Sequence, residues 1–209
     1  MLREQIWLIS EDGLRLEGEL VCPDEPWGGA ILTHPHPRHG GNMRSMVPGE
    51  LIEHLPALGM ATLRFNFRGM GNSEGEFEDG VGERLDTFAA IKTLHEVVEG
   101  LPLVLFGSSF GADTALTVDD PNLSGWCALA PPIRDYRLDA MQEVAVDPKP
   151  KLLIVAERDK YRDPENVAEV TRSWSNTRIA TIPGADHFFV GRIDKVIETC
   201  EQFALEFKS

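Results

Sequence analysis

A serine that could act as a nucleophile lies in the pentapeptide Gly107-Ser-Ser-Phe-Gly111, which has the form G-x-S-x-G. The apolar run Leu101–Phe106 precedes it, and a helical pattern, Ala112–Val118, follows it. Between a strand and a helix, this motif holds its central serine on a tight, strained turn with the hydroxyl exposed above the edge of a sheet. Ser109, and not Ser108, is therefore the candidate nucleophile. The alternative role for Ser109 is to cap the following helix.

A nucleophilic serine needs a base that takes its proton and a carboxylate that orients the base. In a site of this kind they follow in the chain order serine, acid, histidine. His187 is the only histidine after Ser109, and it lies in a loop before the last helical pattern. Among the acids that follow the apolar run Leu152–Ala156, Asp159 lies a few residues beyond the expected strand end, where the three groups should converge. Asp163 directly precedes a proline and suits a helix N-cap instead.

The loop Thr33–Met43 follows the first buried run and is expected to help stabilise a negatively charged oxygen. Acyl transfer develops negative charge on the substrate oxygen, and two backbone N–H groups aimed at that oxygen supply a large share of the rate. One donor should be the N–H of Phe110, directly after the candidate nucleophile. Because Pro35 and Pro37 have no N–H, His36 is the predicted second donor.

Three further side chains are predicted to line the substrate pocket: His34, His39 and Ser108. The three histidines of the loop, His34, His36 and His39, also leave open a metallohydrolase, since imidazole is a common zinc ligand. Their spacing supports that alternative poorly, because no cysteine or carboxylate follows nearby to complete a tetrahedral set. We therefore predict neither a metal nor another cofactor.

The elements that must position these residues alternate along the chain. Two short strands, Gln5–Ile9 and Leu14–Val21, are expected to form an N-terminal hairpin, because the second alternates apolar and polar residues and Asp12-Gly13 between them favours a turn. Short apolar runs predict strands buried on both faces: Ala30–Thr33, Ala61–Phe65, Leu101–Phe106, Gly125–Ala130, Leu152–Ala156 and Arg178–Ile182. Helical spacing is found in Pro48–Leu58, Gly82–Val98, Ser109–Val118, Pro164–Ser175 and Val190–Phe207. This alternation predicts a three-layer α/β/α sandwich with a mainly parallel sheet, as one domain over residues 1–209.

The composition excludes several classes of protein. The chain has 209 residues, of which 42% are apolar, and a formal net charge of −14. A chain this apolar is not intrinsically disordered, and so acidic a protein is unsuited to nucleic acid or anionic membranes, which require clustered lysine and arginine. No apolar stretch is long enough to span a membrane, and no signal peptide is expected. Three cysteines without a C-x-x-C motif favour the reducing cytoplasm.

The negative charge is concentrated in Ser73–Asp86, which holds six acidic residues against a single arginine. We expect a solvated loop that runs into the acid-rich start of a helix. The net charge should also disfavour strongly anionic substrates, unless local arginines such as Arg38 and Arg44 offset it.

Together these motifs resemble those of serine hydrolases of the α/β-hydrolase superfamily, in particular its small bacterial esterase-like members. The resemblance covers nearly the whole chain and rests on His34-Pro-His-Pro37 with Gly40-Gly41, Arg64–Ser73, Gly107–Gly111, Glu157-Arg-Asp159 and Gly184–His187. It implies a twisted, mostly parallel sheet of eight strands. It also implies that Ser109 is the nucleophile, His187 its base and Asp159 the group that orients the base.

Two departures from the family pattern bear on function. Many members have His-Gly after the first buried strand, where this chain has His34-Pro35. Members that bind large lipophilic substrates often insert a cap after the strand that here ends near Ala130, but only Pro131–Lys151 separate that strand from the next. We therefore expect no cap domain, an open site, and a small, soluble ester or thioester as substrate. A peptidase or amidase with the same triad, and a non-catalytic ligand-binding protein, are the alternatives, and monomer and homodimer are both left open.

Overall fold

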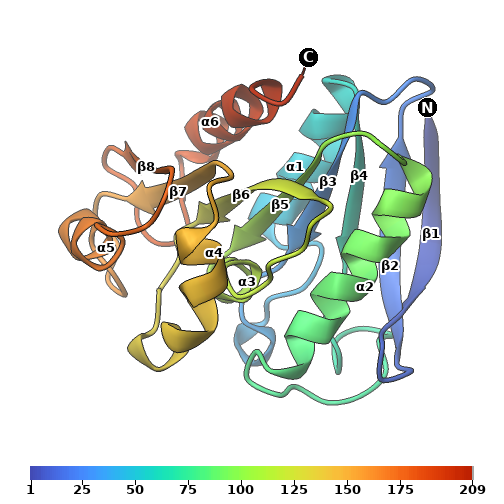
Figure 1. Ribbon diagram of the computed structural model, residues 1–209, viewed down its shortest axis with the longest axis horizontal. Coiled ribbons are helices and arrows are strands. Elements are labelled where there is room, and N and C mark those ends of the chain that lie inside the picture. Colours follow the sequence, from blue (N-terminus) through green and yellow to red (C-terminus); the bar gives the residue numbers. More distant parts are fainter. Residues whose placement is uncertain (209) are drawn as a thin grey trace.

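The computed structural model describes residues 1–208, which contain one sheet of eight strands (Figure 1). The strands are β1 (Leu2–Ile9), β2 (Arg15–Cys22), β3 (Gly28–Thr33), β4 (Met60–Phe65), β5 (Leu103–Ser108), β6 (Leu123–Leu129), β7 (Lys151–Ala156) and β8 (Thr177–Ile182). Across the sheet their order is β1-β2-β4-β3-β5-β6-β7-β8. β2 is antiparallel to both of its neighbours, and the other pairs are parallel. The predicted fold class is therefore confirmed, including the N-terminal hairpin.

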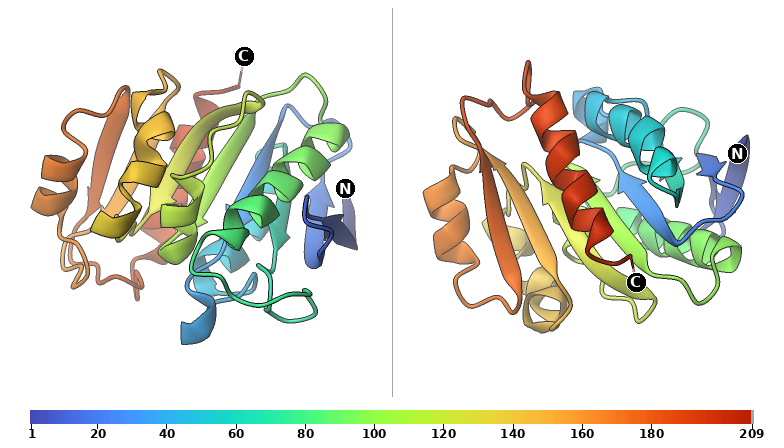
Figure 2. Two further views of the ribbon diagram at one scale, coloured as in Figure 1. Left: turned by 60° about the horizontal axis from the view of Figure 1, so that its bottom comes forward. Right: turned by 90° about the horizontal axis from the view of Figure 1, so that it is seen from above.

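Helices cover both faces of this sheet (Figure 2). On one face lie α1 (Met46–Ala57) and α6 (Ile193–Leu205), and on the other lie α2 (Gly82–Val97), α3 (Phe110–Ala115), α4 (Gln142–Val146) and α5 (Pro164–Val170). Successive residues of the central strands alternate between the two apolar cores: Ile31 faces α2 and α3, whereas Ala30 and Leu32 face α1 and α6. Both faces of each central strand are buried, which is why these strands appear in the sequence as continuous apolar runs.

The helix expected over Pro164–Ser175 is shorter than the helical spacing indicated. Asp163 caps its start by accepting the N–H of Asn166 at 2.8 Å, as predicted, but α5 ends at Val170. The N–H of Ser175 donates instead to the carbonyl of Ala145, at 2.8 Å. This bond to a segment about thirty residues away competes with helix formation, and helical periodicity gives no sign of it.

The connection between β6 and β7 is too short for a cap. Residues 130–150 hold only two 3₁₀ turns, Asp135–Arg137 and Asp139–Met141, and the five-residue helix α4. The carboxyl edge of the sheet consequently has no separate domain above it, in agreement with the sequence-based expectation. Among residues 1–208, no helix has the length and apolar character needed to cross a bilayer.

The acidic segment Ser73–Asp86 is a solvated loop up to Asp79, as its charge predicted, but its acids are buried at the start of α2. The loop side chains Glu74, Glu76, Glu78 and Asp79 are exposed, whereas Glu83 and Asp86 are fully buried. Asp86 receives hydrogen bonds from the buried guanidinium of Arg68, at 2.8 and 3.0 Å, and Arg68 also bonds to Glu78 at 2.9 Å. Glu83 accepts backbone N–H groups of its own loop. Since buried carboxylates are tolerated when paired and hydrogen-bonded, these contacts explain how Glu83 and Asp86 can lie in the interior.

Candidate active site

Ser109 lies on a sharp turn between β5, which ends at Ser108, and α3, which begins at Phe110. Its φ of 53° and ψ of −115° are a strained combination for a residue with a side chain. The turn is possible because glycines flank it. A Cβ atom on Gly107 would lie 2.5 Å from the carbonyl oxygen of Gly111, and one on Gly111 would lie 2.6 Å from the backbone of the Thr33 loop. The hydroxyl of Ser109 makes no capping bond to α3, so the alternative role as a helix cap is not realised.

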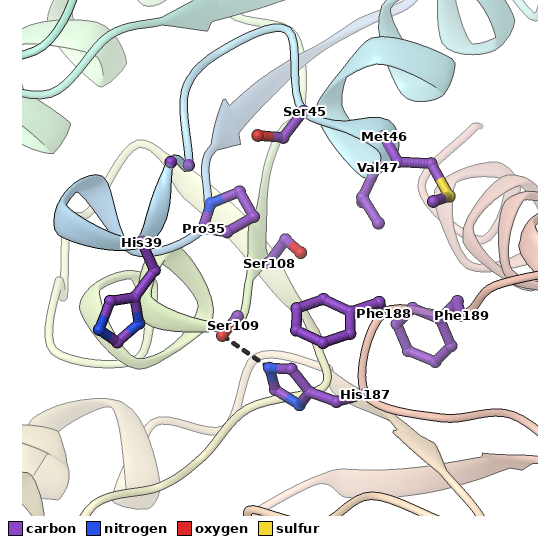
Figure 3. A pocket seen from close by; sticks show the side chains of 12 residues that line it. Pro35, His39, Ser45, Met46, Val47, Ser108, Ser109, His187, Phe188 and Phe189 are labelled. Atoms are coloured by element: carbon purple, nitrogen blue, oxygen red, sulfur yellow. Dashed lines mark hydrogen bonds between the residues drawn. The ribbon is translucent and has the colours of Figure 1, made fainter.

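A hydrogen-bonded chain links Ser109 to His187 and Asp159. The Ser109 Oγ lies 2.9 Å from Nε2 of His187 (Figure 3). Nδ1 of the same ring lies 2.7 Å from Oδ2 of Asp159, and Oδ1 of Asp159 accepts the N–H of Tyr161 at 2.9 Å. Because the carboxylate accepts the Nδ1 proton, Nε2 is left as an acceptor that faces the serine hydroxyl.

The sheet brings these three residues together from distant parts of the chain. Ser109 follows β5, Asp159 follows β7 and His187 follows β8, and these parallel strands end at the same edge of the sheet. The rings of Tyr161 and Phe188 contact the His187 ring edge to face, with centroids 4.4 and 5.2 Å away. Only 6% of His187 and 8% of Asp159 is exposed. The arrangement can therefore move a proton between Ser109 and His187 while largely shielding the acid from water.

The two residues predicted to supply backbone N–H groups, Phe110 and His36, are neighbours, with ring centroids 5.0 Å apart. Phe110 is the first residue of α3, so its N–H has no partner one turn earlier in the helix. Within residues 1–208 the N–H of His36 has no recorded acceptor, while its carbonyl accepts the N–H groups of His39 and Gly41. Both N–H groups are thus free to donate to a bound oxygen.

Two cavities meet at Ser109. Pro35, His39, Ser109, His187 and Phe188 line both of them. The first cavity, about 210 Å³, adds Gly40, Gly41, Ser45, Met46, Val47, Ser108 and Phe189 (Figure 3). The second, about 220 Å³, adds His36, Pro132, Arg134 and Tyr161. A ligand bound at Ser109 has space for one arm in each cavity.

A family model described as an alpha/beta hydrolase domain matches residues 31–204. The chain belongs to the alpha/beta hydrolase family. An uncharacterized protein of Rickettsia prowazekii is 29% identical to this alpha/beta hydrolase over 98% of this chain and 90% of its own.

Solved structures of other bacterial proteins are similar over nearly the whole chain. An alpha-beta serine hydrolase homologue from Coxiella burnetii is 30% identical, covers 95% of this chain and 96% of its own, and superimposes with a TM-score of 0.84. A serine hydrolase without a lid from Xanthomonas campestris is 25% identical, covers 96% and 92%, and has a TM-score of 0.85. The second likeness agrees with the absence of a cap between β6 and β7 within residues 1–208.

Of the three side chains predicted to line the substrate pocket of this alpha/beta hydrolase, two line a cavity and one does not. His39 and Ser108 line the first cavity, as expected. His34 does not, and this prediction was wrong: its ring is fully buried, Nδ1 donates to the carbonyl of Pro35 at 2.6 Å, and Nε2 accepts the N–H of Phe67 at 3.1 Å. Because both ring nitrogens of His34 are occupied, it is unsuited to ligate a metal with His36 and His39. Residues 1–208 hold no group of three or more His, Cys, Asp or Glu side chains placed to bind a metal ion.

Arg134 and Tyr161 line the second cavity, although no motif in the sequence indicates them as site residues. Both come from loops that follow sheet strands, β6 for Arg134 and β7 for Tyr161. Their position just after a strand of a parallel sheet was the available signal, since ligands bind at this edge.

Burial of His34 makes the stability of the protein sensitive to pH. Burial lowers the pKa of His34 from 6.5 to about 4, so the unfolded chain binds this proton more readily than the folded one. The contribution of His34 to stability is then fully present above pH 6.5 and is lost as the pH decreases towards 4, by about 3 kcal/mol. We expect His34→Gln to reduce, by about this amount, the difference in unfolding free energy between pH 7 and pH 4, measured with urea.

The matched control is His54→Gln, which makes the same chemical change at a half-exposed histidine on α1. An equal pH dependence of the wild type and His34→Gln would contradict the role given to His34.

Proposed function

We propose that this alpha/beta hydrolase is a serine hydrolase that cleaves small, soluble esters or thioesters with short acyl groups, through an acyl-enzyme intermediate. The observation that carries the proposal is the chain of contacts from Ser109 through His187 to Asp159, at 2.9 and 2.7 Å. These are the nucleophile, base and orienting carboxylate that acyl transfer requires. The family match supports hydrolysis in general, and the proposal adds the residues and the kind of bond.

The proposed reaction has two halves. Ser109 Oγ attacks the substrate carbonyl carbon as His187 Nε2 takes its proton, and the N–H groups of Phe110 and His36 donate to the oxyanion. The bond to the leaving group breaks as His187 returns the proton to it, which leaves Ser109 acylated. Water then attacks the acyl-enzyme with His187 again as base, and the acid is released. Asp159 holds the imidazole in the tautomer that both halves need.

The dimensions of the site support a small substrate. Each cavity measures little more than 200 Å³, and within residues 1–208 no cap domain extends the apolar walls above Ser109. A long acyl chain would consequently leave the cavity and lie in water, where additional CH₂ groups gain no burial. The expected partner is thus a small molecule, with neither nucleic acid nor membrane involved.

A series of p-nitrophenyl esters tests this proposal. We expect kcat/KM to be highest for short acyl groups and to stop rising well before about ten carbons, because the cavity cannot bury more apolar surface. A steady rise past that length would contradict the short-acyl preference. Matched thioesters and aminoacyl amides distinguish ester hydrolysis from amidase or peptidase activity. A protein that reacts with no acyl-directed probe would instead be a non-catalytic member of the fold.

We further propose the cytoplasm as the compartment. The support comes from the cysteines: Cys22, Cys127 and Cys200 are all free thiols, although the sulfur atoms of Cys127 and Cys200 lie only 4.0 Å apart. Unpaired thiols at this distance suit a reducing environment.

A further inference from the structure

Arg134 lies in the wall of the second cavity, in the loop that follows β6, and comes directly after Ile133. The fully buried carboxylate of Asp113 fixes its position. That carboxylate accepts the N–H of Ile133 at 2.7 Å, the N–H of Arg134 at 3.3 Å and Nη1 of the Arg134 side chain at 3.0 Å. The backbone and the guanidinium are therefore anchored by one group. The side chain stays 28% exposed, so it can meet a ligand without first becoming ordered.

The guanidinium of Arg134 retains unused hydrogen-bond donors. Within residues 1–208 only Nη1 has an acceptor, which leaves Nη2 and Nε available. A guanidinium presents its N–H groups in a planar fork that matches the two oxygens of a carboxylate. The apolar walls around it, Pro132, Tyr161 and Phe188, suit the carbon skeleton that would join such a carboxylate to the ester.

Other charges around this cavity favour an anion. The exposed ammonium of Lys160 lies near the rings of Tyr161 and Phe188, at 5.1 and 5.7 Å from their centroids. In the part of the chain that the structure describes, neither Lys160 nor Arg38 forms an ion pair.

The nearby carboxylates are mostly engaged. Asp113 and Asp159 each accept several hydrogen bonds, and Asp135 pairs with Arg162 at 2.7 Å. Asp79 near His36 has no such partner among residues 1–208 and opposes the cations.

The charge of Arg134 also reaches the loop beside Ser109. The pKa of His36 is lowered mainly by burial, then by His39 and by the charge of Arg134, whereas Asp79 acts in the opposite direction. The positive charges around His36 produce a local field that stabilises negative charge. This field would stabilise a bound anion and also the oxyanion that develops next to His36 during acyl transfer.

On this basis, and resting on the proposed serine hydrolase function, we propose that the second cavity is a subsite for a substrate carboxylate that binds Arg134. The substrate class is thus an ester or thioester with a free carboxylate on the arm that enters this cavity, while the other arm lies in the first cavity against Met46, Val47 and Phe189. The net charge of −14 predicted the opposite preference, with Arg38 and Arg44 as possible exceptions. Arg134 is the residue that reverses it locally.

Matched pairs of neutral and anionic esters test the subsite. For a carboxylate on the leaving group, 3-acetoxybenzoate is compared with 3-acetoxybenzamide, and for the acyl side monomethyl succinate is compared with dimethyl succinate. For at least one pair, we expect Arg134→Gln to lower the ratio of kcat/KM for the anionic ester over the neutral ester by about tenfold. The loss should appear mainly in KM. Arg134→Lys should retain part of the ratio, because it keeps the charge but loses the fork.

Arg178→Gln is the matched control, since it removes the same charge from an exposed position on β8 that pairs with Glu206. An equal change of the ratio in Arg178→Gln, or an unchanged ratio in Arg134→Gln for both pairs, would overturn the subsite. The unpaired Asp113 could prevent Arg134→Gln from folding, which circular dichroism detects. In that case the wild type decides: its ratio should fall as salt rises from about 20 mM to about 500 mM, and a constant ratio overturns the proposal.

Failure of the proposed function has a different signature. A folded wild type that hydrolyses none of these esters contradicts ester hydrolysis without testing Arg134. Calorimetry with 3-hydroxybenzoate and 3-hydroxybenzamide then tests the subsite directly. Tighter binding of the carboxylate that is lost in Arg134→Gln supports it, and equal binding of the two compounds overturns it.

Discussion

Replacement of Ser109 by alanine should abolish ester turnover, with a fall in kcat of about 10³- to 10⁶-fold. Among residues 1–208, the substitution removes the only oxygen that lies in hydrogen-bond contact with Nε2 of His187, at 2.9 Å, so no acyl-enzyme can form. Alanine also lacks the group that a fluorophosphonate phosphonylates. Two measurements check this result: the turnover of p-nitrophenyl acetate, and the covalent labelling of the protein followed by mass spectrometry.

The neighbouring serine provides a matched comparison for labelling. Ser108 carries the same hydroxyl, lines the first cavity and is 6% exposed, but it has no recorded contact with His187 among residues 1–208. Ser108→Ala should therefore still be labelled at Ser109. Labelling that survives in Ser109→Ala and disappears in Ser108→Ala would identify Ser108 as the nucleophile and refute the proposed mechanism.

Asp159→Asn should lower kcat by about 10³- to 10⁴-fold while the fold is retained. The carboxylate of Asp159 accepts three N–H groups: Oδ1 accepts those of Tyr161 and Arg162, at 2.9 and 3.5 Å, and Oδ2 accepts that of Nδ1 of His187, at 2.7 Å. An asparagine has one oxygen and one NH₂ group, and so cannot accept N–H groups on both sides. If its NH₂ faces His187, the imidazole adopts the other tautomer, with the proton on Nε2, and cannot take a proton from Ser109.

Asp163→Asn is the control for this substitution. It makes the same chemical change four residues later, at an exposed helix cap where asparagine is also favoured, and should leave kcat close to that of the wild type. Steady-state kinetics on a short-acyl ester, with thermal unfolding of each variant, separate a catalytic loss from a structural one. Activity of Asp159→Asn within about tenfold of the wild type would remove Asp159 from the mechanism.

The architecture and the order of the candidate residues could be derived from the chain because both depend on local patterns. Apolar runs of a few residues, separated by segments with helical spacing, are sufficient to predict a covered, mostly parallel sheet. The G-x-S-x-G motif around Ser109 requires a sharp turn, and a single histidine after it leaves one base available. The short connection after β6 indicates that a cap is absent. Each of these inferences uses only residues close together in the chain or their order.

The same loop histidines illustrate where such inference ends. His34 and His36 lie two residues apart, and both were expected near the substrate. The ring of His34 turns inward, because Phe67 supplies an N–H to Nε2 and Pro35 a carbonyl to Nδ1, whereas His36 lines the second cavity. The donor from Phe67 lies 33 residues away in sequence, on a segment that reaches His34 only once the sheet has formed.

Local patterns in the amino-acid sequence therefore determined the fold class, the strained turn at Ser109 and the order of the candidate nucleophile, acid and base along the chain. The tertiary structure decided which polar groups meet: Ser109 with His187, Arg134 with Asp113, and Arg68 with Asp86. Hydrophobic periodicity reports only whether a residue faces the core of its own strand or helix. Whether a buried charge finds a partner, and whether an arginine is left free to bind a substrate, depends on residues that only the packing of the sheet and its loops brings together.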